Sequence, residues 1–594
     1  MKIRRHYLTL RNSYPLILED APFEVTVEEL SGMVDCTHRN MVLLLKRMQL
    51  EGWISWTPRK GRGNRSSLVF LARREQIALQ EAQELVAKQD LRAALELVQS
   101  MEPSALLKEQ FQEWLAGRFG FHTELQGARR TDTLRFPLQQ TIHTLDPAAI
   151  HYTGESHLVN QLFDGLVRMD PKGAAILPHL AHAWEVDASR TLWTFYLCKG
   201  VLFHHGREMR AADVKYSLER LKGLAPRGLY SWVYAGIASI ETPDDTTIHI
   251  RLTERNEAFL AFLTTNRASI VPQDVCEGSG LQFGQTPVGT GPFRLTSKEQ
   301  GVWILEAFDR YFHGRGFLDL VEVWTLPEGN SNGPSAELPS FQVMHNVRMT
   351  DNASDQWQQV RQSGMTCKFV TVNESKNGPL ADVSLREAID YAIDRQYLME
   401  LLSGDVIEEA NSFWPEVEGV HEHRTPRDLN DIARRLQAAG YRGETLILAT
   451  IPQYEADAKL IQEVCARSGI ALELQLIPAE EFKGHARMSA DLLLFAIMLD
   501  EHRELRLVDL FKSMQQHALP GMQTFLDHHI RLLLAEPDVH SRTAIFNQLE
   551  QELTRRHSLL FLYRKHLKTA FHPSIRGISL ESLGWVRFKD LWFT

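Results

Sequence analysis

The sequence has 594 residues, of which 44% are apolar and 24% are charged, and its net charge is −10. This length exceeds what one hydrophobic core usually supports, so we expect two or more domains. The longest apolar run, Leu492 to Leu499, is far shorter than the roughly 20 residues that a membrane-spanning helix requires.

The N-terminal segment MKIRRHYLTLRNSYP lacks the apolar core and the cleavage site of a secretory signal. The five cysteines are scattered and form no CxxC pair, a pattern typical of reduced thiols. We therefore expect a cytoplasmic chain without disulfides. The 24 histidines, including His204-His205 and His528-His529, show no metal-ligand spacing, and we expect neither a metal nor another cofactor.

Charge is distributed unevenly along the chain. Residues 1–74 contain 13 Lys and Arg and 7 Asp and Glu, a net charge of +6, whereas the remaining residues contain 52 and 68, a net charge of −16. A basic head on an acidic body indicates that only the head meets phosphate groups.

Residues 26–71 have the pattern of a helix-turn-helix followed by a basic hairpin. Thr26 and Glu29 form a capping-box pattern, Asp35-Cys36 is the expected turn, and Thr37 is a good cap for the second helix. The apolar residues of that second helix recur at helical spacing and are expected in the core: Met41, Leu44, Leu45 and Met48.

The hairpin consists of two predicted strands, 53–56 and 67–71, joined by the loop PRKGRGNR, which is basic and rich in glycine. Together with the helices it predicts a winged helix-turn-helix over residues 1–72 that binds double-stranded DNA. The alternative is a packing element with a solvated turn. The predicted DNA contacts are Thr37, His38, Arg39, Asn40, Lys46, Arg47, Arg59, Lys60, Arg62 and Arg65.

Residues 73–128 are predicted to form a helical connector of two helices, the second beginning at Pro103-Ser104 and ending near Gly117. Three roles are possible for these helices: transmitting the ligand state to the head, forming a dimer contact, or acting only as a spacer. The sequence therefore does not decide whether the protein is a homodimer.

Residues 129–594 mix helical and strand patterns. A strand is expected at Leu134–Leu138, and the segment from TLILATIP to ALELQLIP reads as two apolar strands around a helix, a βαβ unit. The Gly289-Thr290-Gly291-Pro292 loop has the glycines of a phosphate cradle but not the Lys-Ser pair of a P-loop, which favours a structural loop. No GxSxG, HExxH or paired Cys-His pattern predicts an enzyme.

Several segments of this body resemble the family 5 solute-binding proteins, the oligopeptide, dipeptide and nickel binders of ABC transporters. They are LFDGLVRMD, the stretch from Leu180 to Leu221, PVGTGPFRL, SLREAIDYAIDR and the closing YRKHLKTAFHPSIRGISLESLGWVRFKDLWF. With the head included, the chain resembles the SgrR family of transcriptional regulators, through Cys36, Arg39, Met41, Leu44, Leu45, Met48, Gly52-Trp53, Trp56 and Gly61-Arg62-Gly63.

The resemblance implies a multidomain protein, with an α/β body of the type II periplasmic-binding-protein fold behind the winged helix. Lobe 1 would comprise about 129–368 and 560–594, and lobe 2 about 369–559. The chain would cross between the lobes near Phe369–Asn373 and Leu559–Tyr563, with the ligand enclosed between them.

Four residues are the candidate ligand contacts: Tyr152, Asn373, Trp414 and Asp500. Asp500 matches the acid that holds a ligand amine in peptide receptors, but the Trp and Tyr that accompany it there are missing, which argues against a peptide. For each candidate a structural role is the alternative, such as core packing for Trp414, a helix cap for Asp500 and turn hydrogen bonds for Asn373.

These features predict a regulator that senses a small solute, such as a sugar, a sugar phosphate or a peptide-like molecule, and thereby changes its binding to a promoter. The alternative is the solute-binding receptor of an ABC transporter. We expect no membrane partner.

Overall fold

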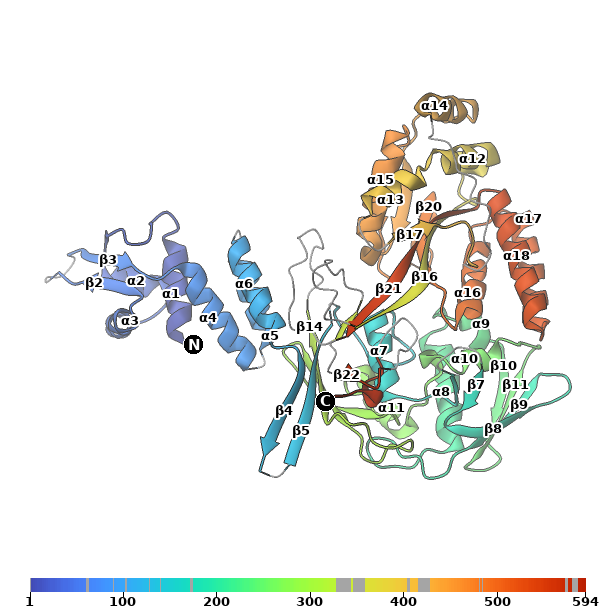
Figure 1. Ribbon diagram of the computed structural model, residues 1–594, viewed down its shortest axis with the longest axis horizontal. Coiled ribbons are helices and arrows are strands. Elements are labelled where there is room, and N and C mark those ends of the chain that lie inside the picture. The colour runs from blue at the N-terminus through green and yellow to red at the C-terminus, as the bar shows by residue number, and fades with distance from the viewer. Residues whose placement is uncertain are drawn as a thin grey trace. The chain divides into compact units, whose positions relative to one another are not determined.

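The computed structural model describes residues 2–59, 64–88, 90–101, 104–127, 129–138, 140–170, 175–326, 343–345, 358–402, 406–414, 428–479, 481–482, 484–571, 575–578 and 586–593 (Figure 1). Two compact units divide the chain. The first comprises residues 1–141, 296–305 and 320–342, and the second comprises 142–295, 306–319 and 343–594. None of the helices in the described ranges combines the length and the apolar character of a membrane span.

The head contains three helices, α1 (Lys2–Ser13), α2 (Val27–Met33) and α3 (His38–Leu50). They pack on a three-stranded antiparallel sheet of order β1-β3-β2, formed by β1 (Phe23–Val25), β3 (Ser66–Phe70) and β2 (Ile54–Thr57). The predicted capping box begins α2, and the predicted strands of the hairpin are β2 and β3. The sequence analysis did not predict α1, whose Tyr7 is buried edge-to-face against Trp53 and Phe70.

Three helices follow the head where two were predicted: α4 (Arg74–Ala87), α5 (Leu91–Ser100) and α6 (Ala105–Ala116). The predicted first helix is divided because Asp90 caps α5, its carboxylate accepting a hydrogen bond from the Ala93 N–H at 3.1 Å. The last helix ends at Ala116, as the prediction of an end near Gly117 requires, and the remainder of the predicted connector forms strand β4 (Gly120–Gln126).

The five-stranded sheet after the connector has the order β12-β13-β14-β5-β4. Its other strands are β12 (Phe293–Glu299), β13 (Val302–Ala307), β14 (Leu320–Thr325) and β5 (Arg129–Leu138). The strand predicted at Leu134–Leu138 is the second half of β5, which pairs antiparallel with β4 and parallel with β14.

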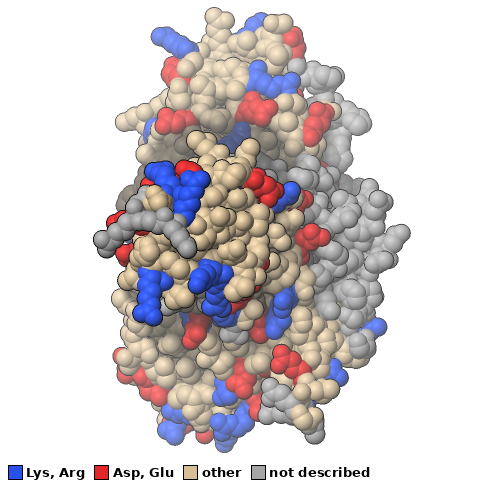
Figure 2. All heavy atoms as spheres, turned by 90° about the vertical axis from the view of Figure 1, so that its left-hand side faces the viewer, with Lys and Arg blue, Asp and Glu red and all other residues tan. Residues whose placement is uncertain are grey.

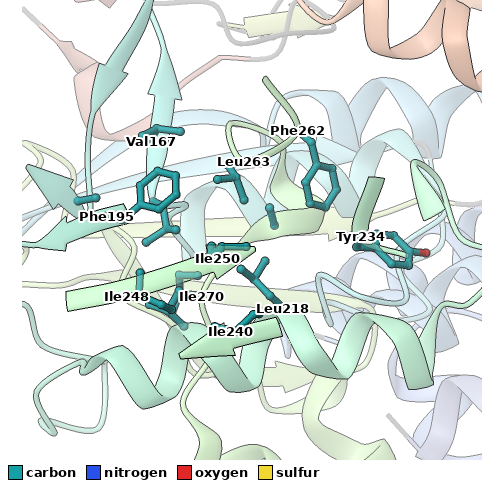
Figure 3. Close-up of a cluster of buried hydrophobic side chains, with 14 of the residues drawn as sticks. Val167, Phe195, Leu218, Tyr234, Ile240, Ile248, Ile250, Phe262, Leu263 and Ile270 are labelled. Atoms are coloured by element: carbon teal, nitrogen blue, oxygen red, sulfur yellow. The ribbon is translucent and has the colours of Figure 1, made fainter. Parts of the chain in front are cut away.

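The lobe 1 part of the second unit is built on a four-stranded antiparallel sheet of order β10-β11-β9-β8. The strands are β10 (Ile237–Glu241), β11 (Thr247–Leu252), β9 (Leu192–Leu197) and β8 (Ala181–Val186). Helices α7 (Thr153–Leu162), α8 (Ala211–Leu224), α9 (Ser231–Tyr234) and α10 (Phe259–Phe262) accompany them. Figure 3 shows a core shared by this sheet and helices α8, α9 and α10, in which Ile250 of the sheet lies between Phe195 and Leu218 of α8.

The rest of the second unit, which includes the predicted lobe 2 and strands on either side of its bounds, contains a mixed sheet of order β15-β21-β16-β20-β18-β19, to which β17 is added through β21. Its strands are β15 (Val343–His345), β16 (Gln358–Val372), β17 (Val406–Glu409), β18 (Leu446–Thr450), β19 (Leu472–Leu476), β20 (Leu492–Met498) and β21 (Leu559–Phe571). The predicted βαβ unit is confirmed, because β18 and β19 are parallel and α15 (Glu455–Arg467) connects them.

The described residues of this part also form α12 (Val383–Ala392), α13 (Arg395–Leu401), α14 (Leu429–Ala438), α16 (Arg503–Gln515), α17 (Pro520–Ala535) and α18 (Val539–Arg555). The long strands β16 and β21 run side by side (Figure 1), with Phe369 opposite Phe561. The segments predicted to cross between the lobes lie at the end of β16 and at the start of β21.

Candidate nucleic-acid interface and ligand pocket

One face of α3 presents the polar residues that the sequence analysis assigned to DNA. The Thr37 side chain caps the helix by accepting a hydrogen bond from the Asn40 N–H at 3.3 Å. Met41, Leu45 and Met48 are buried in the core of the head, so the opposite side of the helix faces outward. The exposed residues there are His38, Arg39, Asn40, Lys46 and Arg47. Such a face suits insertion into a DNA groove.

The cations of the head differ in their pairing. Within the described residues, Arg39, Lys46 and Arg47 form no ion pair, whereas Arg59 pairs with Glu24 and Arg65 with Glu29, each at 3.0 Å.

Exposed ion pairs such as that of Arg59 with Glu24 contribute little stability. Lys60 and Arg62 lie outside the described residues. Figure 2 shows groups of Lys and Arg side chains on the face that it presents, next to larger uncharged areas.

Tyr152 lies at the start of α7 in lobe 1. Its N–H donates to Glu155, whose fully buried carboxylate also accepts backbone N–H groups of His143, Thr144 and His151. The Tyr152 ring packs on His143, with 5.2 Å between the ring centroids. Glu155 thus folds the loop that precedes α7 and fixes the position of Tyr152.

Asn373 follows β16 and is buried. Its side-chain amide donates to the carbonyl oxygens of Met488 and Ala490, at 3.0 and 2.9 Å. These bonds hold the segment 486–490 against the end of β16.

Helix α16 contacts both Trp414 and Asp500. Arg503 stacks on the Trp414 ring, with its guanidinium carbon 4.0 Å from the centroid, and Arg506 pairs with Asp500 at 2.8 Å. Burial alone would raise the pKa of Asp500, but Arg506 and His502 lower it below its usual value.

Asp500, Glu501 and His502 place one ligand atom each within 4.8 Å of one another, as a metal site would. However, Asp500 already holds Arg506, and the His502 ring hydrogen bonds to Thr264 at 2.9 Å. To bind a cation, Asp500 would therefore have to give up its ion pair with Arg506.

Direct hydrogen bonds join lobe 1 to lobe 2. Besides the bond between Thr264 and His502, the Tyr230 N–H donates to Asp509 at 3.1 Å and the Glu257 N–H donates to the Leu534 carbonyl at 2.8 Å. Burial raises the pKa of Tyr230 to about 12 and lowers that of His502 to about 4. Both side chains are therefore neutral near pH 7.

A pocket of about 450 Å³ lies beside these contacts, a size that suits a small solute. Lobe 1 supplies one wall from the segment that leads into α9, and lobe 2 supplies the other from the segment before β20 and from α16. The lining residues are Pro226, Arg227, Gly228, Ser231, Trp232, Ala235, Gly484, His485, Met488, Asp509, Lys512, Ser513 and Gln516.

The Gly289–Pro292 loop has a structural role. Thr290 is fully buried and its hydroxyl donates to Asp164 at 2.8 Å, while the Gly291 N–H donates to the Leu162 carbonyl at 3.0 Å. Side chains at Gly289 or Gly291 would overlap the backbone of Leu162, which explains both glycines.

Comparison with known proteins decides the family of this chain. The bacterial extracellular solute-binding proteins, family 5, match residues 175–514. The chain belongs to this family. Residues 2–120 of this family 5 protein also match the N-terminal domain of the sugar transport-related sRNA regulators, which accounts for the helix-turn-helix head.

Relatives of this family 5 protein match its whole length. The HTH-type transcriptional regulator SgrR of Yersinia enterocolitica is 27% identical over 589 residues, which are 96% of each chain. The uncharacterized protein YhjP of Bacillus subtilis is 29% identical over 585 residues, again 96% of each chain.

A solved structure confirms the fold of the body. The ABC transporter-associated periplasmic binding protein DppA of Helicobacter pylori, in complex with the peptide STSA, has a TM-score of 0.65. It is 22% identical and covers 78% of this chain and 98% of its own.

None of the four predicted ligand residues lines the pocket of this family 5 protein, although Asn373 holds Met488, which does. The polar lining residues were not predicted from the sequence; they include Arg227, His485, Lys512, Ser513 and Gln516. Lys512 and Gln516 are four residues apart near the end of α16, which is the one local signal that they share a side. Ligand contact by Tyr152, Asn373, Trp414 and Asp500 stays a prediction.

Proposed function

We propose that this chain is a ligand-responsive, DNA-binding transcriptional regulator that senses a small solute between the lobes of its body. The observation that carries the proposal is the match of transcriptional regulators named SgrR over 96% of both chains, head and body together. The proposed activity is binding, without a catalytic step. Because its target is DNA, we expect the chain in the cytoplasm.

The head acts as a winged helix in this proposal. Helix α3 enters the major groove with Arg39 and Asn40 near its start, since these side chain types suit guanine and adenine edges. The hairpin β2–β3 is the wing, and its arginines contact the sugar-phosphate backbone. We take residues 1–72 as this domain, 73–128 as the connector and 129–594 as the sensor. A homodimer on paired half-sites stays open.

The body acts as the sensor. A solute held by both lobes favours the arrangement in which they touch, and it shifts the equilibrium only by its difference in affinity between the two arrangements. The chain passes between the two compact units after residues 141, 295, 305, 319 and 342, so they are joined by several segments rather than by one linker. A coupling of about 1–3 kcal/mol between solute and DNA would be typical.

The alternative, a solute-binding receptor of a transporter, rests on the fold of the body, which solved receptors share over 78% of the chain. It gives no role to the head, whose exposed cations on α3 suit a polyanion. The regulator accounts for both parts.

The test is a titration of the full chain with the DNA upstream of its own gene and of neighbouring genes, at about 0.15 M salt. The proposal predicts sequence-dependent binding that a solute changes. Equal affinity for every DNA sequence, together with solute binding, would favour the receptor.

A further inference from the structure

Arg487 is a buried cation with neutral partners. It is fully buried, and its guanidinium donates to the Ser513 hydroxyl oxygen at 2.6 Å, the Ser513 carbonyl at 3.2 Å and the Gln516 side-chain oxygen at 2.8 Å. Throughout the described ranges, no carboxylate oxygen lies within 4.0 Å of it. Burial lowers the pKa of Arg487 to about 10, so it keeps its charge at neutral pH. The carboxylate of Asp509 attracts the guanidinium without forming an ion pair with it, and a buried charge that lacks a direct partner is costly.

Ser513 and Gln516, the partners of Arg487, line the pocket. Their hydrogen bonds with the arginine determine which polar atoms they can present to a ligand. A guanidinium only donates hydrogen bonds, so the Ser513 hydroxyl oxygen and the Gln516 side-chain oxygen must both accept from it. What remains for the pocket is the hydroxyl hydrogen of Ser513 and the NH₂ group of Gln516, and both are donors. Trp232, in the opposite wall, has an indole N–H without an acceptor among the described residues.

The charged residues of the lining also favour an anionic ligand. Arg227, His485 and Lys512 line the pocket, and no ion pair within the described residues engages them. The carboxylate among the lining residues is Asp509, which already accepts the Tyr230 N–H. Donors and cations therefore outnumber acceptors and anions on the walls.

We propose that this pocket binds the oxyanion of the solute, a phosphate or a carboxylate group. Lys512 and the donors of Ser513 and Gln516 hold it from lobe 2, and Arg227 approaches from lobe 1. The bound anion adds to the negative charge that Asp509 already brings near Arg487. Because the walls come from both lobes, an anion bound between them favours their contact, and in this respect the inference rests on the proposed sensing function.

Binding of matched solutes to the full chain, measured by calorimetry, tests the charge requirement. The probes are inorganic phosphate, a hexose with its 6-phosphate, and a tripeptide with its C-terminal amide. We expect inorganic phosphate to bind at millimolar concentration and the charged member of at least one pair to bind at least about 10-fold more tightly than the neutral one. A preference within the hexose pair identifies a phosphate, and within the peptide pair a carboxylate. Equal affinities in both pairs, or no binding of phosphate, would overturn the proposal.

Variants of the pocket locate the anion. Lys512→Gln should weaken binding of the charged probe about 10-fold, and Ser513→Ala should weaken it several-fold without removing the buried arginine. The control is Lys459→Gln on α15, an exposed lysine that pairs with Glu455 and is absent from the pocket lining. Unchanged affinity in both pocket variants would refute the assignment. These measurements use no DNA, so they test the anion site separately from the proposed regulation. Either proposal can be refuted while the other is supported.

Discussion

Replacing Asp500 by Asn tests whether this carboxylate supports the fold or is held ready for a ligand. Its side chain is fully buried, accepts two hydrogen bonds from Arg506 at 2.8 and 3.1 Å and accepts the His502 N–H at 3.0 Å. Asn has nearly the same size but no charge, so the variant leaves Arg506 unpaired with its side chain 20% exposed. Breaking a buried ion pair costs about 3–5 kcal/mol, and the partial exposure of Arg506 favours the lower end, about 3 kcal/mol.

The expected change in melting temperature follows from the size of the unit. The second compact unit has about 420 residues, and an unfolding entropy of about 2.1 cal/mol/K per residue gives about 0.9 kcal/mol/K. A loss of about 3 kcal/mol therefore lowers the midpoint by roughly 3 °C.

Thermal unfolding of the ligand-free chain, followed by circular dichroism, measures this shift. The matched control is Asp527→Asn on α17, which removes the exposed ion pair with Arg531 and should change the midpoint by less than about 1 °C. If Asp500→Asn melts with the parent chain, the ion pair does not stabilise the fold, and the reasoning from burial is wrong.

Three further predictions concern DNA and pH. Arg39→Ala should cost about 1–3 kcal/mol on the preferred DNA sequence and much less on unrelated DNA, which competition titrations of both DNAs would measure. Arg59→Gln should weaken binding to all sequences similarly and reduce the slope of log affinity against log salt by about 1, whereas an unchanged slope would place the hairpin away from DNA. Burial lowers the pKa of His204 and His502 to about 4 and that of His517 to about 3. The unfolded chain therefore binds more protons below about pH 6.5. Stability should fall between about pH 6.5 and 4, by roughly 1.4 kcal/mol per pH unit for each histidine. Urea unfolding at pH 7.5, 6.5 and 5.5 checks this, and equal midpoints would contradict it.

Local signals made much of the head predictable. Thr26 and Glu29 form a capping box that needs only its own four residues, and the apolar spacing of Met41, Leu45 and Met48 defines one face of α3. By contrast, the first turn of α1 carries no acidic residue that would mark its start, and the helix is held by Tyr7, which packs on rings far along the chain.

The rest of the candidate site depends on tertiary contacts. Nothing near Arg487 in the sequence shows that its partners are Ser513 and Gln516, or that no carboxylate of the described residues reaches it. Likewise, Asp500 resembles a ligand-binding acid in sequence, and only the structure shows Arg506 already bound to it.

The central claim is that one chain joins a DNA-reading head to a solute sensor. Fluorescence anisotropy at about 0.15 M salt, with labelled DNA from the upstream region and a scrambled DNA of equal composition, tests it most directly. The regulator should bind the upstream DNA at least about 1,000-fold more tightly. Equal affinity for the two DNAs would contradict the claim.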